Sequence, residues 1–210
     1  MRLGMTFGLV LLVGGALAAQ QMNPHIGHIM DSFGDTPNQQ GLLPTAMAEA
    51  KIAAQHAGLA AKAPDDLAAM QLHAGHVLHA VDPSVEANGP GQGYGVKRAA
   101  QGVAQHVGLA AKTEGASANI KTHSTHVTAS AENVVAWSDE IVALGQKVKA
   151  ATTAAAAAPM VGELNTLAQR LTTGVDANGD GQVDWQKGEG GLQQAQQHME
   201  LMRRGEGGRP

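Results

Sequence analysis

The sequence predicts an all-α protein, and three observations support this fold class. Alanine is abundant, and aromatic residues make up only 2% of the 210 residues. No segment shows the alternation of β-branched and polar residues that indicates a strand. A segment of about twenty-five residues recurs at a fixed offset, and each copy has the pattern of two helices joined by a short loop. The predicted architecture is an up-down helical bundle built from a duplicated αα-hairpin, followed by a C-terminal helix–loop–helix.

The first eighteen residues have the pattern of a secretory signal peptide. Arg2 precedes an apolar run over 5–17, and Ala16-Leu17-Ala18 supplies small residues for cleavage. The run is too short for a comfortable transmembrane helix. We therefore expect a periplasmic or secreted protein with no membrane span after cleavage of 1–18. An uncleaved membrane anchor is the alternative.

The repeat defines the bundle that we expect over 19–157. AAQHAGLAAK at 53–62 matches VAQHVGLAAK at 103–112, an offset of fifty residues. The copies span 44–87 and 95–136, separated by the Gly/Pro-rich linker NGPGQGYG. Gly, Pro and Asp signals place the helix ends. The predicted helices are 44–62, 65–81, 96–112, 117–135, 137–157 and 160–172.

Histidines recur at matched positions of the two copies. His73 and His76 lie three residues apart on one helix face, and His123 and His126 repeat this spacing. Folding each hairpin about its turn brings His56 to the level of His73, and His106 to the level of His123. Such clusters favour Zn²⁺, Cu²⁺ or Ni²⁺ at two quasi-equivalent sites, to which Glu49 could add a ligand beside His56.

Two other interpretations of these histidines stay open. A b-type haem with two histidine ligands fits between helices of a bundle. Imidazoles that only hydrogen-bond to one another are the structural alternative. His25-Ile26-Gly27-His28 resembles His73-Ala74-Gly75-His76, which suggests the vestige of a third copy.

The C-terminal stretch DANGDGQVDWQKGE begins at Asp176 and places oxygen ligands at alternate positions. This spacing resembles the EF-hand calcium loop, which needs Gly at its sixth position, here Gly181. The resemblance implies a Ca²⁺ site between flanking helices within 158–204, followed by a disordered tail over 205–210. Lys187 stands where the family has a bidentate carboxylate, and we expect Glu189 to replace it. The predicted calcium ligands are Asp176, Asn178, Asp180, Gln182, Asp184 and Glu189.

The composition excludes several functions. The absence of Cys rules out disulfides, thiolate zinc sites and iron–sulfur clusters. A net charge of −4 without a basic run predicts no nucleic-acid partner, and no feature specifies a protein partner. No nucleophile–base pair, phosphate loop or paired carboxylates occurs, so we predict that the protein is not an enzyme. The leading prediction is an exported calcium-binding protein; the alternatives are transition-metal binding or buffering, or haem transport, by the repeated histidines.

Overall fold

The computed structural model describes residues 23–207, which form helices, turns and loops without a strand. The all-α prediction is confirmed for this part of the chain. The predicted signal peptide lies outside the described residues, as do the last three residues of the predicted tail. The elements are α1 (Pro24–Met30), the 3₁₀ turn η1 (Pro37–Gln39), α2 (Leu42–Ala61), α3 (Leu67–Val81), α4 (Val96–Lys112), α5 (Ala118–Ala150), α6 (Ala154–Thr173) and α7 (Leu192–Gly205).

Side-chain caps explain where several helices begin. The carboxylate of Asp66 accepts the Ala69 N–H at 2.9 Å and starts α3. The hydroxyl of Ser117 accepts the Ile120 N–H at 3.0 Å and starts α5. Each cap satisfies a backbone N–H that has no partner within the first turn of its helix.

The predicted boundaries between 135 and 160 are wrong. The expected helix over 117–135 and most of the expected helix over 137–157 form one helix, α5, of 33 residues, because no Gly or Pro breaks the chain near 136; residues 154–157 belong to α6. The next break comes at 151–153, where Thr153 caps α6 and its hydroxyl accepts the Ala156 N–H. The start expected near Pro159 therefore lies inside α6. Helix α1 was not predicted as a helix.

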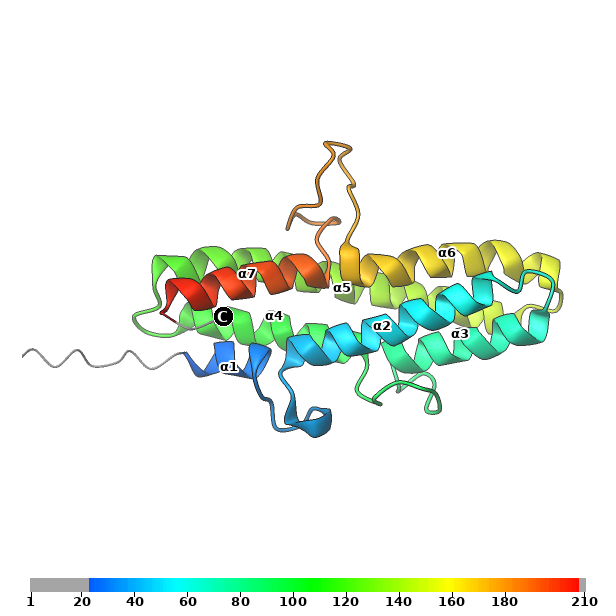
Figure 1. Ribbon diagram of the computed structural model, residues 1–210, viewed down its shortest axis with the longest axis horizontal. Helices are drawn as coiled ribbons and strands as arrows, with labels where there is room; N and C mark the ends of the chain where they lie inside the picture. Colours follow the sequence, from blue (N-terminus) through cyan, green and yellow to red (C-terminus); the bar gives the residue numbers. More distant parts are fainter. Residues whose placement is uncertain (1–22, 208–210) are drawn as a thin grey trace, which may run out of the picture.

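The long helix α5 organises the bundle. It packs against α3, α4, α6 and α7. Helices α7 and α6 follow one another along it, and the loop over 174–191 projects from the bundle between them (Figure 1). Helices α1 and α4 lie toward one end of the molecule, and α2 and α3 lie toward the other (Figure 1).

Small residues let these helices approach closely. Ala50, Ala53 and Ala57 of α2 are fully buried, as are Val103 and Val107 of α4. Glycines receive larger side chains from neighbouring helices. A Cβ atom on Gly102 would lie 2.8 Å from Leu42 Cδ2, and one on Gly145 would lie 2.8 Å from Leu78 Cδ2. The core therefore consists largely of small side chains, and larger ones pack closely against the glycines of neighbouring helices.

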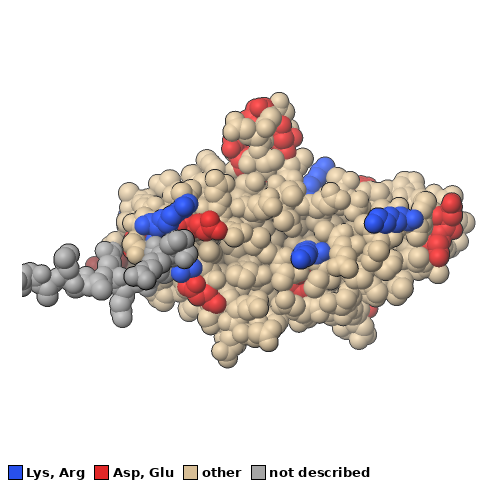
Figure 2. Space-filling view, in the orientation of Figure 1, with Lys and Arg blue, Asp and Glu red and all other residues tan. Residues whose placement is uncertain are grey.

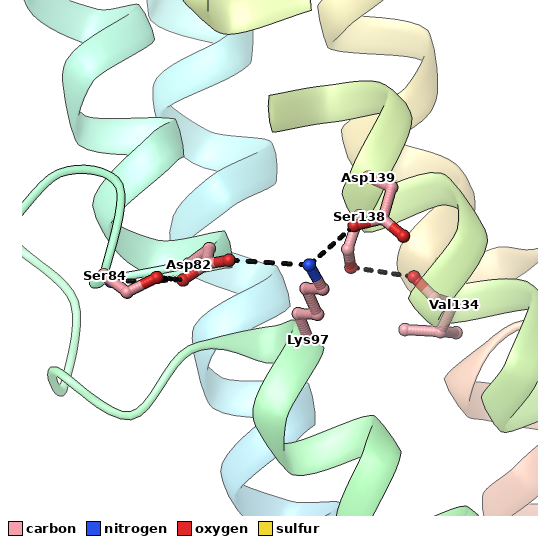
Figure 3. A network of polar contacts seen from close by, with 6 residues as sticks. All are labelled: Asp82, Ser84, Lys97, Val134, Ser138 and Asp139. Carbon is pink, nitrogen blue, oxygen red and sulfur yellow. Dashed lines mark hydrogen bonds and ion pairs between the residues drawn. The ribbon is translucent and has the colours of Figure 1, made fainter. Parts of the chain in front are cut away.

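A polar network joins three helices near the middle of the chain (Figure 3). Lys97 Nζ lies 2.7 Å from Asp139 Oδ1 on α5 and 3.7 Å from Asp82 Oδ2 at the end of α3. The hydrogen bond to Asp139 raises the pKa of Lys97, as do the charges of both carboxylates, against the effect of burial. The Ser138 hydroxyl donates to the Val134 carbonyl at 2.7 Å within α5.

None of the described helices combines the length and the apolar character needed to cross a lipid bilayer. Acidic side chains gather on the projecting loop, which carries Asp176, Asp180 and Asp184 (Figure 2).

Candidate metal centres

Nine of the ten histidines of the chain lie in three groups of three. In each group, two histidines three residues apart on one helix meet a single histidine from another helix. The rings are partly exposed, and the ligand atoms of each group lie within 4.8 Å of one another. We name them triad A (His25, His28 and His106), triad B (His56, His73 and His76) and triad C (His123, His126 and His198).

The Nδ1 atoms of each triad converge on the single histidine. In triad A, Nδ1 of His106 lies 3.0 Å from Nδ1 of His25 and 3.3 Å from that of His28. In triad B, Nδ1 of His56 lies 3.1 Å from its counterpart in His73 and 3.2 Å from that in His76.

Triad C repeats this geometry. Nδ1 of His198 lies 3.0 Å from Nδ1 of His123 and 3.3 Å from that of His126. The three groups therefore share one arrangement of atoms, although they come from different helices.

Hydrogen bonding alone does not satisfy this arrangement. A ring nitrogen carries either one proton or one lone pair, so it makes one well-directed hydrogen bond. The Nδ1 atom of the single histidine, however, faces two other Nδ1 atoms. A cation between them would accept all three lone pairs. In a tetrahedral zinc site with Zn–N bonds of about 2.0–2.1 Å, neighbouring nitrogens are about 3.3–3.4 Å apart, close to the spacing in the triads.

Burial favours the neutral form, which binds metals, in seven of the nine triad imidazoles. It lowers the pKa of most triad histidines, and in several the charge that a neighbouring imidazole would carry lowers the pKa further. The effect is largest in His198, whose pKa falls from 6.5 to about 4, chiefly through burial and then through His126 and His123, although Asp184 opposes it. At neutral pH the lone pairs of these rings are available to a metal ion.

Only one of the two repeats forms the predicted group of histidines. His56 joins His73 and His76 as predicted, but His106 does not group with His123 and His126. The same faces of the two hairpins are buried, yet α1 lies against α4, and α7 against α5. His106 therefore meets α1, while His123 and His126 meet α7. The expectation of two sites is corrected to three groups.

Three of the nine triad residues were not predicted as metal ligands: His25, His28 and His198. Two short motifs could have found them. His-x-x-His occurs at 25–28, 73–76, 76–79 and 123–126, and Gln-His-x-x-Leu occurs at 55–59, 105–109 and 197–201; of the His-x-x-His motifs, only that at 76–79 extends outside the triads, because it includes His79. Each triad combines one motif of each kind.

Aromatic rings contact two of the triads. The Phe33 ring packs against His106 and His28 of triad A, with ring centres 5.0 Å and 5.5 Å apart. The Trp185 ring stacks on His126 of triad C at 4.0 Å, with 16° between the planes. These contacts restrict the orientation of the imidazoles that they cover.

The two remaining candidates near triad B have structural partners. The tenth histidine, His79, is 6% exposed, and its Nδ1 lies 2.9 Å from the Glu86 carbonyl oxygen. Buried Glu49 accepts the backbone N–H groups of Gln92, Tyr94 and Gly95 at 3.0–3.1 Å. Glu49 thus holds the linker between the repeats and is not grouped with His56.

The acidic loop is ordered around its first aspartate. The carboxylate of Asp176 accepts the N–H groups of Gly179, Asp180 and Gly181 at 2.7–3.2 Å. Asn178 Oδ1 accepts the Asp180 N–H at 2.8 Å, and Asp180 Oδ1 accepts the Gln182 N–H at 2.9 Å. These side-chain bonds to the backbone hold 176–182 in a series of turns.

The end of the loop is held against the bundle. The Glu189 side chain is 2% exposed, and its Oε2 accepts the Asp184 N–H at 3.2 Å, whereas Lys187 is exposed. Asn133 of α5 donates to the carbonyls of Gln186 and Gly190 and accepts the Gly188 N–H. Within the described chain, no three carboxylate residues of the loop each place an oxygen within 4.8 Å of the other two.

Comparison of the chain with protein-family models, with curated proteins and with solved structures found no match.

Proposed function

We propose that this protein binds three divalent transition-metal ions, of the class of Zn²⁺, Cu²⁺ or Ni²⁺, one in each triad, and buffers them. The observation that carries the proposal is the approach of two Nδ1 atoms to the Nδ1 atom of a third histidine, at 3.0–3.3 Å, in three separate places. Neutral imidazoles suit these metals, and the absence of thiolates disfavours soft ions such as Cu⁺.

Partial exposure of the triads favours buffering over a structural role. Three protein ligands leave at least one coordination position for water or for a ligand from a partner. Because all nine rings reach the surface, an ion can enter and leave without unfolding of the bundle. The same geometry disfavours haem, since the axial ligands of a haem lie on opposite faces of a flat ring and these nitrogens are almost in contact.

Equilibrium titration of untagged, metal-free protein tests the proposal. With Zn²⁺, Ni²⁺ or Cu²⁺ as the probe, we expect three ions per chain by calorimetry and by elemental analysis after desalting. His56→Ala, His106→Ala and His198→Ala should each reduce the stoichiometry by one ion, because each removes the ring shared by both Nδ1 contacts of its triad.

His79→Gln is the matched control, since this histidine lies outside the triads, and it should leave three ions bound. A stoichiometry near zero for the wild type, or three ions in all three triad variants, would overturn the proposal. A Soret band in the purified protein would favour haem instead.

Calcium binding by the acidic loop is the second candidate function. It is favoured by the conformation of Asp176, whose carboxylate gathers three successive backbone N–H groups, and by the inward position of the buried Glu189. Both features agree with an EF-hand-like loop in which Glu189 replaces the ligand lost at Lys187. A weak site, with a dissociation constant of about 10⁻⁴–10⁻³ M, fits the loop and an extracellular compartment.

Millimolar Ca²⁺ should raise the melting temperature if this loop binds calcium. The Asp176→Ala, Asp180→Ala double variant should abolish the rise, and Glu189→Gln should weaken it. Lys187→Ala is the control and should retain the rise. No shift in the wild type at millimolar Ca²⁺ refutes this candidate.

The proposal also includes two features outside the metal sites. The protein is exported to the periplasm or outside the cell, and its duplicated hairpins have an up-down arrangement.

A further inference from the structure

The three triads differ in how much of the fold depends on them. Triad A takes two of its three histidines from α1, a helix of only seven residues. Isolated helices shorter than about 12–15 residues are marginal in water, so α1 depends on its contacts with the bundle. Its fully buried side chains are Ile26 and Ile29, which pack toward α4 and α2.

The polar contacts around α1 are few and near solvent. Asn23 Nδ2 donates to Thr113 Oγ1 at 3.0 Å and lies 3.4 Å from the Ala110 carbonyl oxygen. Asp31 pairs with Arg203 of α7 at 2.9 Å, but the carboxylate is 49% exposed. An exposed ion pair of this kind contributes little to stability. Burial of Ile26 and Ile29 therefore supplies most of the free energy that offsets the conformational entropy lost when α1 is ordered.

The helices joined by triads B and C are held independently of the histidines. Triad B joins α2 and α3, which are consecutive, long and extensively packed against each other. Triad C joins α5 to α7, whose Leu192, Ala195, Met199 and Met202 are all fully buried. Only in triad A do two ligands lie on an element with so few other contacts.

We propose that α1 is a latch closed by metal: a divalent transition-metal ion in triad A holds α1 on α4, and loss of that ion releases α1. Release uncovers the apolar surface beneath Ile26 and Ile29. Part of the binding free energy in triad A is used to order α1, so this triad binds its ion more weakly than triad B. As the metal concentration rises, triad B therefore fills before triad A. The state of α1, bound or released, therefore depends on how many of the triads hold a metal ion. This inference rests on metal binding by the triads.

Hydrogen exchange of the full chain, measured by mass spectrometry in metal-free buffer and with buffered free Zn²⁺, tests the latch. With free Zn²⁺ at about 100 times the dissociation constant of triad A, exchange of the amides of 25–31 should slow by up to about 100-fold. Amides of 67–81 in α3 should change much less. The His25→Gln, His28→Gln double variant should bind two ions and lose the effect in α1. The matched variant His73→Gln, His76→Gln should also bind two ions but keep the effect.

Each outcome is decisive when exchange is measured beside the bound-metal content. Three bound ions with unchanged exchange in α1 would overturn the latch and leave the proposed function intact. Slower exchange of α1 in the His25→Gln, His28→Gln variant would also overturn it, because the effect would then arise elsewhere. If no ion binds to the wild type, the proposed function and the latch both fail.

Discussion

The sharpest test of the triads is a graded thermal stabilisation by metal. The perturbation is replacement of the single histidine of each triad by alanine, in His56→Ala, His106→Ala and His198→Ala. These rings carry both short Nδ1 contacts of their groups. They are also partly exposed, so truncation leaves no sealed cavity in the core.

The expected size of the effect follows from mass action. An ion that binds only the folded state stabilises it by about 2.7 kcal/mol when its free concentration is 100 times the dissociation constant. In a chain of about 150–250 residues, 1 kcal/mol shifts the melting temperature by about 2–4 °C. Each filled triad should therefore add about 5–11 °C, and three filled triads about 16–32 °C.

Differential scanning calorimetry at a buffered free concentration of Zn²⁺ measures these shifts. We expect His56→Ala and His198→Ala each to keep about two thirds of the wild-type shift, and His106→Ala to keep a larger part, because triad A binds its ion more weakly. The variant that combines all three substitutions should keep none. The control His79→Gln should keep the whole shift, whatever its melting temperature without metal. The reasoning is refuted if the triple variant is stabilised as much as the wild type, because the ion would then bind outside the triads.

Three further predictions concern pH and local contacts. Folding lowers the pKa of His198 from 6.5 to about 4, so His198 takes up a proton at a higher pH in the unfolded chain than in the folded one. The free energy of unfolding of the metal-free protein should therefore fall as the pH drops from about 6.5 to about 4. Urea titration at each pH measures this change. Asn133→Ala removes three hydrogen bonds to the 186–190 segment and should reduce stability by about 2 kcal/mol and shift the fluorescence of Trp185, whereas fluorescence like that of the wild type would contradict the anchoring role. Lys97→Met should reduce stability by no more than about 1 kcal/mol in a denaturant titration and leave the metal stoichiometry at three, because the Asp139 side chain is 59% exposed.

The sequence specified the faces of the helices well. The burial pattern over 51–60 is identical to that over 101–110, as the repeat implies. The boundaries of α2, α3 and α4 lie within two residues of their predicted positions, because Gly, Pro and Asp mark them. The single helix α5 was not predicted, although the absence of Gly and Pro near 136 favours a continuous helix.

Predicting which histidines form each triad requires knowledge of how the helices pack. A turn determines which residues of a hairpin lie at the same level, and this was enough to predict triad B. It does not determine which neighbouring helix a side chain faces when several helices surround it. His106 faces α1, and His123 faces α7, because both helices pack beside the second hairpin. Neither helix belongs to the repeated unit in which the partners were sought.

The separations along the chain give the strongest argument that the triads act as sites. The paired motifs lie 17–20 residues apart in triad B, 72–75 in triad C and 78–81 in triad A. Duplication of a hairpin explains why the histidines recur, but it would have paired His106 with His123. Instead, two elements outside the repeated hairpins, α1 and α7, complete the sets with the same motifs and the same spacing of nitrogens. The proposed metal ions, which need converging Nδ1 atoms, would account for this reassembly; packing alone does not require it.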